Sequence, residues 1–398
     1  MQVIEEYGRK RCMIYLSKLV VATWVLVIFV MGATANECAI SEESWKKLEG
    51  LLNLPSTSGS EDKAQAYWLD CVKGGADEVG GDDLKNAWAV FKSKRENAVD
   101  LLIDAHVDEV GYQISEITPE GMIKVEGVGF PDAIGTLGAE YVFFGAKGEV
   151  KAISGRRPSW WRTKRESIPM PDEVLFDVGA ANDAEVRELG LKVGDVGVPA
   201  TKPELINGKR LVAHGLDCRL NVYVLMELAK FLAANKDKIY YNVTLLSSTQ
   251  EEVGLVGCYA YCEKKKPKQA IVLDCVIDTV PNLYEKSRGN TGAHLVMGQG
   301  PVLYTHPNFF STRISNELKQ VAKNINLKCQ EDAGFPPGLA NFVPVKYFGG
   351  EAGFVGPAIR YMHSPRELAD MKDVQGIISL LKAYLTTPPD SLNSAEKK

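Results

Sequence analysis

Three short apolar runs, each followed by acidic or histidine residues, constrain the fold of this chain most strongly. The runs and their polar continuations are Val99–Ile103 before Asp104-Ala105-His106, Val243–Leu246 before Ser247–Glu252, and Ala270–Leu273 before Asp274. Short apolar runs of this length are typical of strands that are buried on both faces. Such strands form the centre of sheets that are covered by helices on both sides.

The segments around these runs have the spacing of helices. Ser41–Leu52, Leu220–Ala234 and Met371–Leu385 carry apolar residues at helical intervals. Alternation of buried strands with amphipathic helices predicts an α/β fold with a mixed sheet flanked by helices.

The stretch from 116 to 206 differs from the rest of the chain in composition and in the spacing of its apolar residues. It is rich in Gly and Val and contains short alternating segments such as Met122–Val125 and Glu149–Ile153. Strict alternation indicates strands with one buried face. We therefore expect a small β-rich domain at 116–206, inserted into a discontinuous catalytic domain formed by 36–115 and 207–398.

The N-terminal 35 residues are typical of a signal peptide. Arg9-Lys10-Arg11 precedes the apolar run Leu19–Met31, and Ala33-Thr34-Ala35 supplies small residues for cleavage before Asn36. This pattern predicts export, to the periplasm or outside the cell. An uncleaved membrane anchor is the alternative, because the run can be extended back towards the about 20 residues that a membrane span needs.

Composition excludes some partners. The formal net charge is −5, which gives the whole chain no attraction for nucleic acid. The basic stretch Arg156–Arg165 contains two tryptophans that could stack on bases. A solvated or subunit-contacting loop is the favoured interpretation, so we expect no nucleic-acid partner.

The chemistry-bearing residues follow the predicted strands. His106 and Asp108, then Glu251 and Glu252, then Asp274 each come at or just after a strand end, where sites form in α/β sheets. Asp217 precedes a predicted helix, and His363 lies in a loop. Imidazoles with carboxylates suit Zn²⁺ or Co²⁺.

Each of these patterns also has a structural explanation. A His-x-Asp triplet is commonly a structural pair, and most adjacent acids are solvated. Two carboxylates directly after a buried strand are costly unless they are paired or metal-bound. On residue types alone, the metal site and the structural alternative both remain open.

Four motifs, in order, resemble one family. The motifs are Leu102-Ile103-Asp104-Ala105-His106-Val107-Asp108-Glu109-Val110-Gly111, Gly215-Leu216-Asp217-Cys218-Arg219, Ser248-Thr249-Gln250-Glu251-Glu252-Val253-Gly254 and Arg360-Tyr361-Met362-His363-Ser364-Pro365. They are similar to signatures of the glutamyl-aminopeptidase family, metallopeptidases that form tetrahedral particles. Val174–Ala180 resembles the inserted domain of that family. The resemblance extends from about Trp45 to Leu385.

The resemblance implies a role for each residue. Asp217 would bridge two divalent metal ions, with His106 and Asp274 completing one site and Glu252 and His363 the other. Glu251 would be the general base that takes a proton from a metal-bound water, and Asp108 would support His106. Zn²⁺ or Co²⁺ is expected, with Mn²⁺ as an alternative.

The same resemblance implies the fold and the partners. The fold would be of the zinc-aminopeptidase type, the substrates would be peptides with a free N-terminus, and the Asp217–Cys218 peptide bond would be cis. Dimers would build a dodecamer, with the inserted domain at 116–206 serving oligomerisation and substrate access.

The sequence departs from the family pattern at several positions. Cys218 stands where the family usually has Asp, and Asn221 where it often has Gly. The family's Gly-Gly-Thr-Asp-Ala segment near the substrate has no clear counterpart in 334–341. These changes bear on substrate selectivity rather than on metal binding. His214, His294 and His306 match no ligand position and are expected to be structural.

Three other functions are compatible with the residues. The chain could be a non-catalytic, metal-containing peptide-binding relative, or a deacylase or carboxypeptidase on the same dimetal core. Some relatives carry a glucanase label, but glycosidases need two carboxyl groups placed about 5–9.5 Å apart around a sugar bond. A metal-saturated cluster is poorly suited to that chemistry.

Overall fold

The computed structural model describes residues 40–155, 158, 160, 169–280, 294–334 and 340–392. The predicted signal peptide at 1–35 and most of the basic stretch Arg156–Arg165 lie outside these ranges. Among the described helices, none combines the length and the hydropathy that a membrane span requires.

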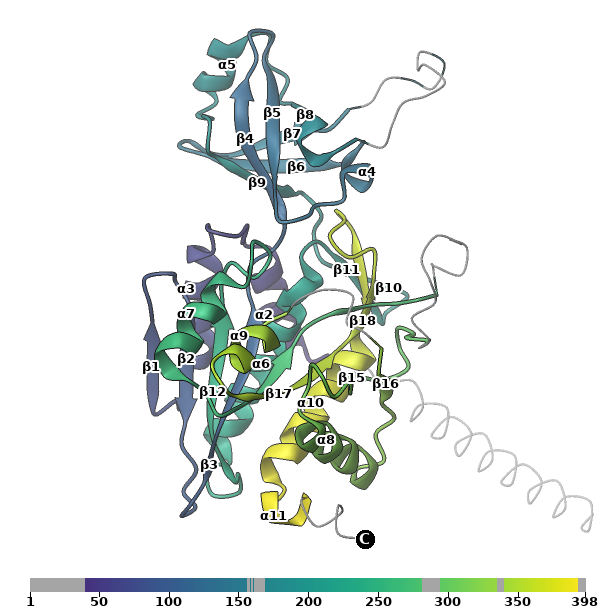
Figure 1. Cartoon of the computed structure of the whole chain (residues 1–398). Helices are drawn as coiled ribbons and strands as arrows, with labels where there is room; N and C mark the ends of the chain where they lie inside the picture. The colour runs from purple at the N-terminus through teal and green to yellow at the C-terminus, as the bar shows by residue number, and fades with distance from the viewer. Residues whose placement is uncertain are drawn as a thin grey trace, which may run out of the picture. The chain divides into compact units, whose positions relative to one another are not determined.

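An eight-stranded mixed sheet forms the centre of the larger domain (Figure 1). Its strands, in spatial order, are β1 (Glu78–Gly81), β2 (Ala87–Phe91), β12 (Tyr241–Ser248), β3 (Val99–His106), β13 (Gln269–Leu273), β17 (Glu351–Gly356), β15 (Val302–Tyr304) and β16 (Gln330–Asp332). The four strands β12, β3, β13 and β17 are parallel, whereas β2 and β15 add antiparallel strands on either side. The three apolar runs are the neighbouring strands β3, β12 and β13, as predicted.

Helices cover both faces of this sheet. The helices are α2 (Glu42–Leu52), α3 (Asp62–Val72), α6 (Leu216–Ala234), α7 (Val256–Lys265), α8 (Thr312–Asn324), α9 (Phe342–Tyr347), α10 (Met371–Thr386) and α11 (Pro389–Leu392). Successive residues of a strand point to opposite faces. On β17, Gly353 lies against Ile314 of α8, whereas its neighbour Phe354 packs with residues of α9. The predicted α/β class, a mixed sheet flanked by helices, is confirmed.

A second sheet connects segments that carry site residues. It contains β10 (Glu204–Ile206), β11 (Arg210–Ala213), β19 (Glu367–Asp370), β18 (Ala358–Arg360) and β14 (Val276–Ile277). β14 follows Asp274 directly, and the loop between β18 and β19 contains His363. Pairing of these short strands therefore fixes the backbone on both sides of His363 and on the C-terminal side of Asp274.

A closed six-stranded barrel is the β-rich insertion. Its strands are β4 (Gly111–Ile117), β5 (Met122–Val128), β8 (Leu175–Asp177), β7 (Gly148–Ile153), β6 (Glu140–Gly145) and β9 (Val196–Pro199), accompanied by the short elements α4 (Ala133–Thr136), η2 (Pro171–Glu173) and α5 (Asp183–Glu188). The barrel begins at Gly111 and ends at Pro199, whereas the sequence sets the insertion at 116–206. The difference arises because β10 pairs with β11 of the second sheet and so belongs to the larger domain.

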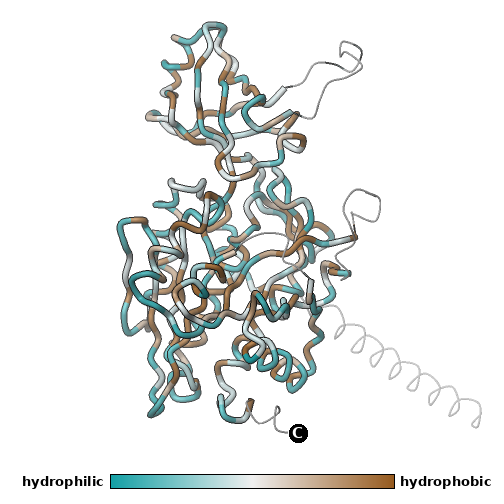
Figure 2. Tube along the Cα trace, in the orientation of Figure 1, coloured by the Kyte–Doolittle hydropathy of each residue, from teal (hydrophilic) through white to brown (hydrophobic). Residues whose placement is uncertain are grey.

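The barrel has its own aromatic core. Buried and exposed residues alternate along β4 and β5, and Figure 2 shows hydrophobic and hydrophilic residues alternating in this part of the chain. The ring of Phe176 lies edge-on to Tyr112, Tyr141 and Phe143 at centroid distances of 5.4, 4.9 and 5.2 Å. Phe176 is fully buried at the centre of this cluster.

We predict that Phe176→Ala destabilises the barrel by about 3–5 kcal/mol, because truncation leaves a cavity between three rings. Leu175→Ala on the same strand is the control, since Leu175 is 42% exposed and should change stability by about 0.5 kcal/mol or less. Hydrogen exchange of the barrel amides measures both effects. Equal exchange rates in the two variants would contradict the central role of Phe176.

Candidate metal centre

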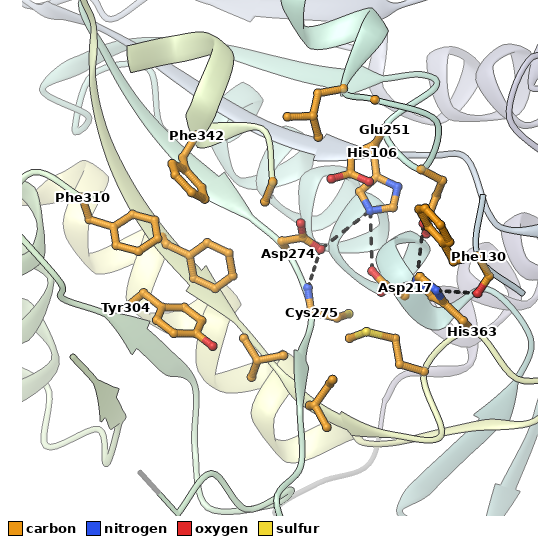
Figure 3. A pocket seen from close by; sticks show the side chains of 18 of the residues that line it. His106, Phe130, Asp217, Glu251, Asp274, Cys275, Tyr304, Phe310, Phe342 and His363 are labelled. Carbon is orange, nitrogen blue, oxygen red and sulfur yellow. Dashed lines mark hydrogen bonds and ion pairs between the residues drawn. The ribbon is translucent and has the colours of Figure 1, made fainter. Parts of the chain in front are cut away.

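The register of the parallel strands brings the polar strand ends together. His106 at the end of β3 pairs with Ser248 at the end of β12, and Asp104 pairs with Val272 of β13. The loop after β12 therefore starts beside His106, and Asp274 follows β13 at the same edge of the sheet. Figure 3 shows these side chains converging from separate elements on one pocket.

Asp217 lies between two imidazoles. Its Oδ1 is 3.5 Å from Nε2 of His106, and its Oδ2 is 3.6 Å from Nε2 of His363. Asp274 Oδ1 lies 3.7 Å from the same nitrogen of His106, and Glu252 Oε2 lies 3.3 Å from the same nitrogen of His363. The two oxygens of Asp217 thus face two separate His–carboxylate pairs.

These residues form overlapping groups with metal-ligand geometry. In each group the donor atoms lie within 4.8 Å of one another; the groups are His106 with Asp217, Cys218 and Asp274, His106 with Glu251 and Glu252, and Asp217 with Glu252 and His363. The structure therefore brings every predicted ligand and the predicted base Glu251 to one place. Asp217 Oδ1 is buried and has no hydrogen-bond partner among the described residues, as expected of an atom that coordinates a cation.

Buried charge gives the pocket its electrostatic character. Burial raises the pKa of Glu251 well above its usual range, and the carboxylates of Asp274 and Glu252 raise it further. Burial also raises the pKa of Asp217, but the two imidazoles outweigh burial and leave this pKa below its usual value. No described residue that lines the pocket is a lysine or arginine. The site therefore concentrates negative charge that divalent cations would neutralise, and its donors fit such ions.

Asp108 connects His106 with the turn that carries Glu251 and Glu252. His106 Nδ1 lies 3.1 Å from the backbone oxygen of Asp108 and 3.5 Å from its carboxylate Oδ1. The carboxylate itself accepts hydrogen bonds from the backbone N–H groups of Glu251 and Glu252, at 3.0 and 3.1 Å, and from the Ser58 hydroxyl at 2.6 Å. Asp108 therefore orients His106 mainly through its backbone and positions the Glu251-Glu252 turn through its side chain.

Two further buried acids, which the sequence did not single out, hold the site loops. Glu367 accepts hydrogen bonds from the backbone N–H groups of Asp217 and His363, at 3.1 and 2.7 Å. Glu61 accepts one from the backbone N–H of Gln250 at 3.1 Å. Gln250 and His363 both have positive φ angles, 54° and 63°, which side-chain-bearing residues adopt only when neighbours stabilise them. The only feature of the sequence that could have indicated this role is the position of Glu367, four residues after His363.

Cys218 lies beside the cluster. The Asp217–Cys218 peptide bond is cis, which confirms the prediction. The thiol donates a hydrogen bond to the Leu273 carbonyl at 3.4 Å and accepts one from Asn221 Nδ2 at 3.0 Å. It is buried, and burial raises its pKa well above the usual range.

The three other described histidines lie outside these groups. His214 Nδ1 contacts Glu109 Oε2 at 2.5 Å, and Arg219 donates to the same oxygen at 2.9 Å. His306 packs against Phe309, and His294 is exposed. Glu109, His214 and Arg219 form a buried hydrogen-bonded network at the start of α6.

The last two residues of the atypical segment 334–341, Ala340 and Asn341, lie at the site. Asn341 Nδ2 donates to Asp104 Oδ2 at 2.7 Å and to the Ser248 hydroxyl at 2.9 Å. Ala340 lines the pocket. Residues 335–339 lie outside the described ranges.

Known proteins share both the sequence pattern and the fold. The chain is 30% identical over 349 residues to the lysyl aminopeptidase of Pyrococcus furiosus, a match that covers 86% of this chain and 96% of that protein. The solved structure of a TET aminopeptidase from a marine sediment Thaumarchaeota archaeon has a TM-score of 0.80 at 25% identity, covering 89% of this chain and 99% of that one. The TET1 peptidase of Pyrococcus horikoshii has a TM-score of 0.74 at 24% identity, covering 86% and 99%.

The sequence profile of M42 glutamyl aminopeptidases matches residues 86–380, which contain the barrel and all the converging side chains. The order of the four motifs, the shared architecture and this match all indicate the same family. The chain belongs to the M42 glutamyl aminopeptidase family, and it is a metallo-aminopeptidase.

Proposed function

We propose that this aminopeptidase works with two divalent metal ions that share the carboxylate of Asp217. The supporting observation is that the two oxygens of Asp217 face different imidazoles, each with its own second carboxylate. His106 and Asp274 would hold one ion, and Glu252 and His363 the other. When bound, such ions polarise a carbonyl oxygen and make a coordinated water acidic.

Imidazole nitrogen with carboxylate oxygen is the donor set that Zn²⁺ and Co²⁺ accept. Mn²⁺ is the alternative, because the set contains three carboxylates and Mn²⁺ favours oxygen donors.

Glu251 is proposed as the general base and not as a ligand. It lies in the pocket beside His106 and Glu252, and its backbone N–H is held by Asp108 at 3.0 Å. A buried carboxyl group with a raised pKa holds a proton more strongly than a solvated one. Glu251 can therefore take a proton from water and return it to the leaving amine.

The described lining of the pocket favours an aminopeptidase over a carboxypeptidase. Two divalent ions would neutralise the carboxylate cluster, and a carboxypeptidase also needs a cationic group for the terminal carboxylate. The described lining offers no lysine or arginine for that purpose. Blocking the α-amine should therefore abolish turnover; rapid hydrolysis of N-acetylated peptides would instead favour a deacylase or carboxypeptidase. Binding without hydrolysis at saturating metal would indicate a non-catalytic relative.

Assembly and localisation are proposed on separate grounds. The Pyrococcus horikoshii TET1 peptidase can assemble into a tetrahedron or a large octahedral shell. We propose that dimers of this chain likewise build a dodecamer, with the barrel contributing contacts through exposed apolar residues such as Ile153, which is 53% exposed. Export to the periplasm or cell exterior rests on the signal-peptide pattern at 1–35, with an uncleaved membrane anchor as the alternative.

We predict that Glu251→Gln keeps both metal ions but lowers kcat by about 10²–10⁴-fold, since it removes a proton acceptor. Asp217→Ala should lower metal content, because both ions lose a shared ligand. Elemental analysis of the purified variants, alongside rate measurements, separates the two roles. A metal-free Glu251→Gln protein would show that Glu251 is a ligand.

Cys218→Ser should leave metal content and peptidase activity close to those of the unmodified protein. The serine hydroxyl can keep both contacts of the thiol, to the Leu273 carbonyl and to the Asn221 amide, and all the proposed ligands remain. Cys71→Ser is the control, because Cys71 lies outside the groups of possible metal ligands. If Cys218→Ser lost metal while Cys71→Ser kept it, the Cys218 sulfur would be identified as a ligand.

We predict that the purified chain is larger than a monomer and that its mass by light scattering corresponds to a dodecamer. Ile153→Asp on the barrel should shift this distribution towards smaller species, because it places a charge on an exposed apolar position. Val79→Asp, at a 49% exposed position of the larger domain, is the control. A monomer at micromolar concentration would contradict the proposed assembly.

A further inference from the structure

The pocket beside the metal centre has two chemically different walls. Its volume is about 1120 Å³, enough for a peptide segment as well as the metal ions. One wall carries the predicted ligands and Glu251. The other carries aromatic side chains, and Figure 3 shows Tyr304, Phe310 and Phe342 grouped on the side away from His363.

The aromatic wall is built by mutual ring contacts. Phe310 lies 4.7 Å from Phe342 and 5.7 Å from both Tyr304 and Phe354, measured between ring centroids. Tyr304 and Phe354 are 5.0 Å apart in an edge-to-face arrangement. The four rings come from β15, from the loop before α8, from α9 and from β17. Because each ring is fixed by others, this wall is preformed.

The aromatic side is the closed end of the pocket. Phe310 and Phe342 are each 2% exposed, whereas Ile277 and Phe130, which also line the pocket, are 40% and 80% exposed. A peptide that enters from the open side therefore ends at the rings. For an aminopeptidase, the part of the substrate that ends there is the side chain of the N-terminal residue.

The described residues of the pocket lining offer no partner for a charged head group outside the metal centre. Apart from the His and acid side chains of the metal centre, the described lining residues are uncharged; examples are Ala340, Val276 and Met362. A lysine or glutamate head group placed against these side chains would lose its hydration without gaining an ion pair, which is unfavourable. An apolar side chain would gain free energy from burial against the rings.

We propose that the aromatic wall selects peptides whose N-terminal residue is apolar or aromatic, and that it discriminates against N-terminal Lys and Glu. The inference rests on the proposed function and adds the substrate class to it. The proposed preference distinguishes this chain from the lysyl aminopeptidase of Pyrococcus furiosus, although the two sequences are 30% identical.

Hydrolysis of tripeptides X-Ala-Ala by the metal-loaded enzyme tests the proposal, with X as Phe, Leu, Ala, Lys or Glu. We expect kcat/KM for Phe and Leu to exceed that for Lys and Glu by about 100-fold or more. Equal or faster cleavage of the Lys or Glu peptide would overturn the selectivity while leaving the aminopeptidase function intact.

Binding of the free amino acids L-Phe, L-Leu, L-Lys and L-Glu, measured by calorimetry, keeps the test independent of turnover. If none of the peptides were cleaved, the proposed catalytic roles would fail, but tighter binding of L-Phe and L-Leu would still support the pocket assignment. Tighter binding of L-Lys or L-Glu would overturn it.

Discussion

The carboxylate of Asp217 is the group around which the rest of the site is arranged. Each of its oxygens faces one imidazole, and the two imidazoles, of His106 and His363, come from segments far apart in the sequence. Glu367 accepts hydrogen bonds from the backbone of Asp217 and of His363, so one buried acid fixes the spacing between the shared carboxylate and its second imidazole. The loop that carries His363 is held further by the pairing of β18 with β19 and by the hydrogen bond from the Asp132 N–H to the His363 carbonyl at 2.9 Å.

Buried acids outside the metal-ligand groups hold the loops of the site in place. Asp108, Glu61 and Glu367 are buried carboxylates that accept backbone N–H groups of the site loops. Such hydrogen bonds compensate the lost hydration of each acid, and they hold Gln250 and His363 in backbone conformations that residues with side chains seldom adopt. The repulsion among the inner carboxylates is then the driving force for cation binding, because relaxation of the loops is blocked.

Much of this arrangement could be predicted from the sequence, and the exceptions have physical causes. Buried parallel strands read as apolar runs, so β3, β12 and β13 were found directly, and the ligands at their ends followed from the motifs. The start of the barrel has no clear mark in the sequence, because β4 begins at Gly111, only five residues after His106 at the end of β3. Glu61 was missed because its partner Gln250 lies far away in sequence. The four rings of the aromatic wall come from separate elements, and only the folded sheet brings them together.

The two walls of the pocket depend on one another. Aromatic side chains line the pocket beside the metal centre, and electrostatic interactions strengthen where apolar groups replace water. Burial raises the pKa of Glu251, and the carboxylates of Asp274 and Glu252 raise it further, so its carboxylate is a stronger proton acceptor than a solvated one. A polar wall fitted to a charged terminal residue would bring ordered water or a counter-ion close to the carboxylates and weaken both effects. In this chain the apolar wall therefore contributes to the reactivity of the base as well as to the choice of substrate.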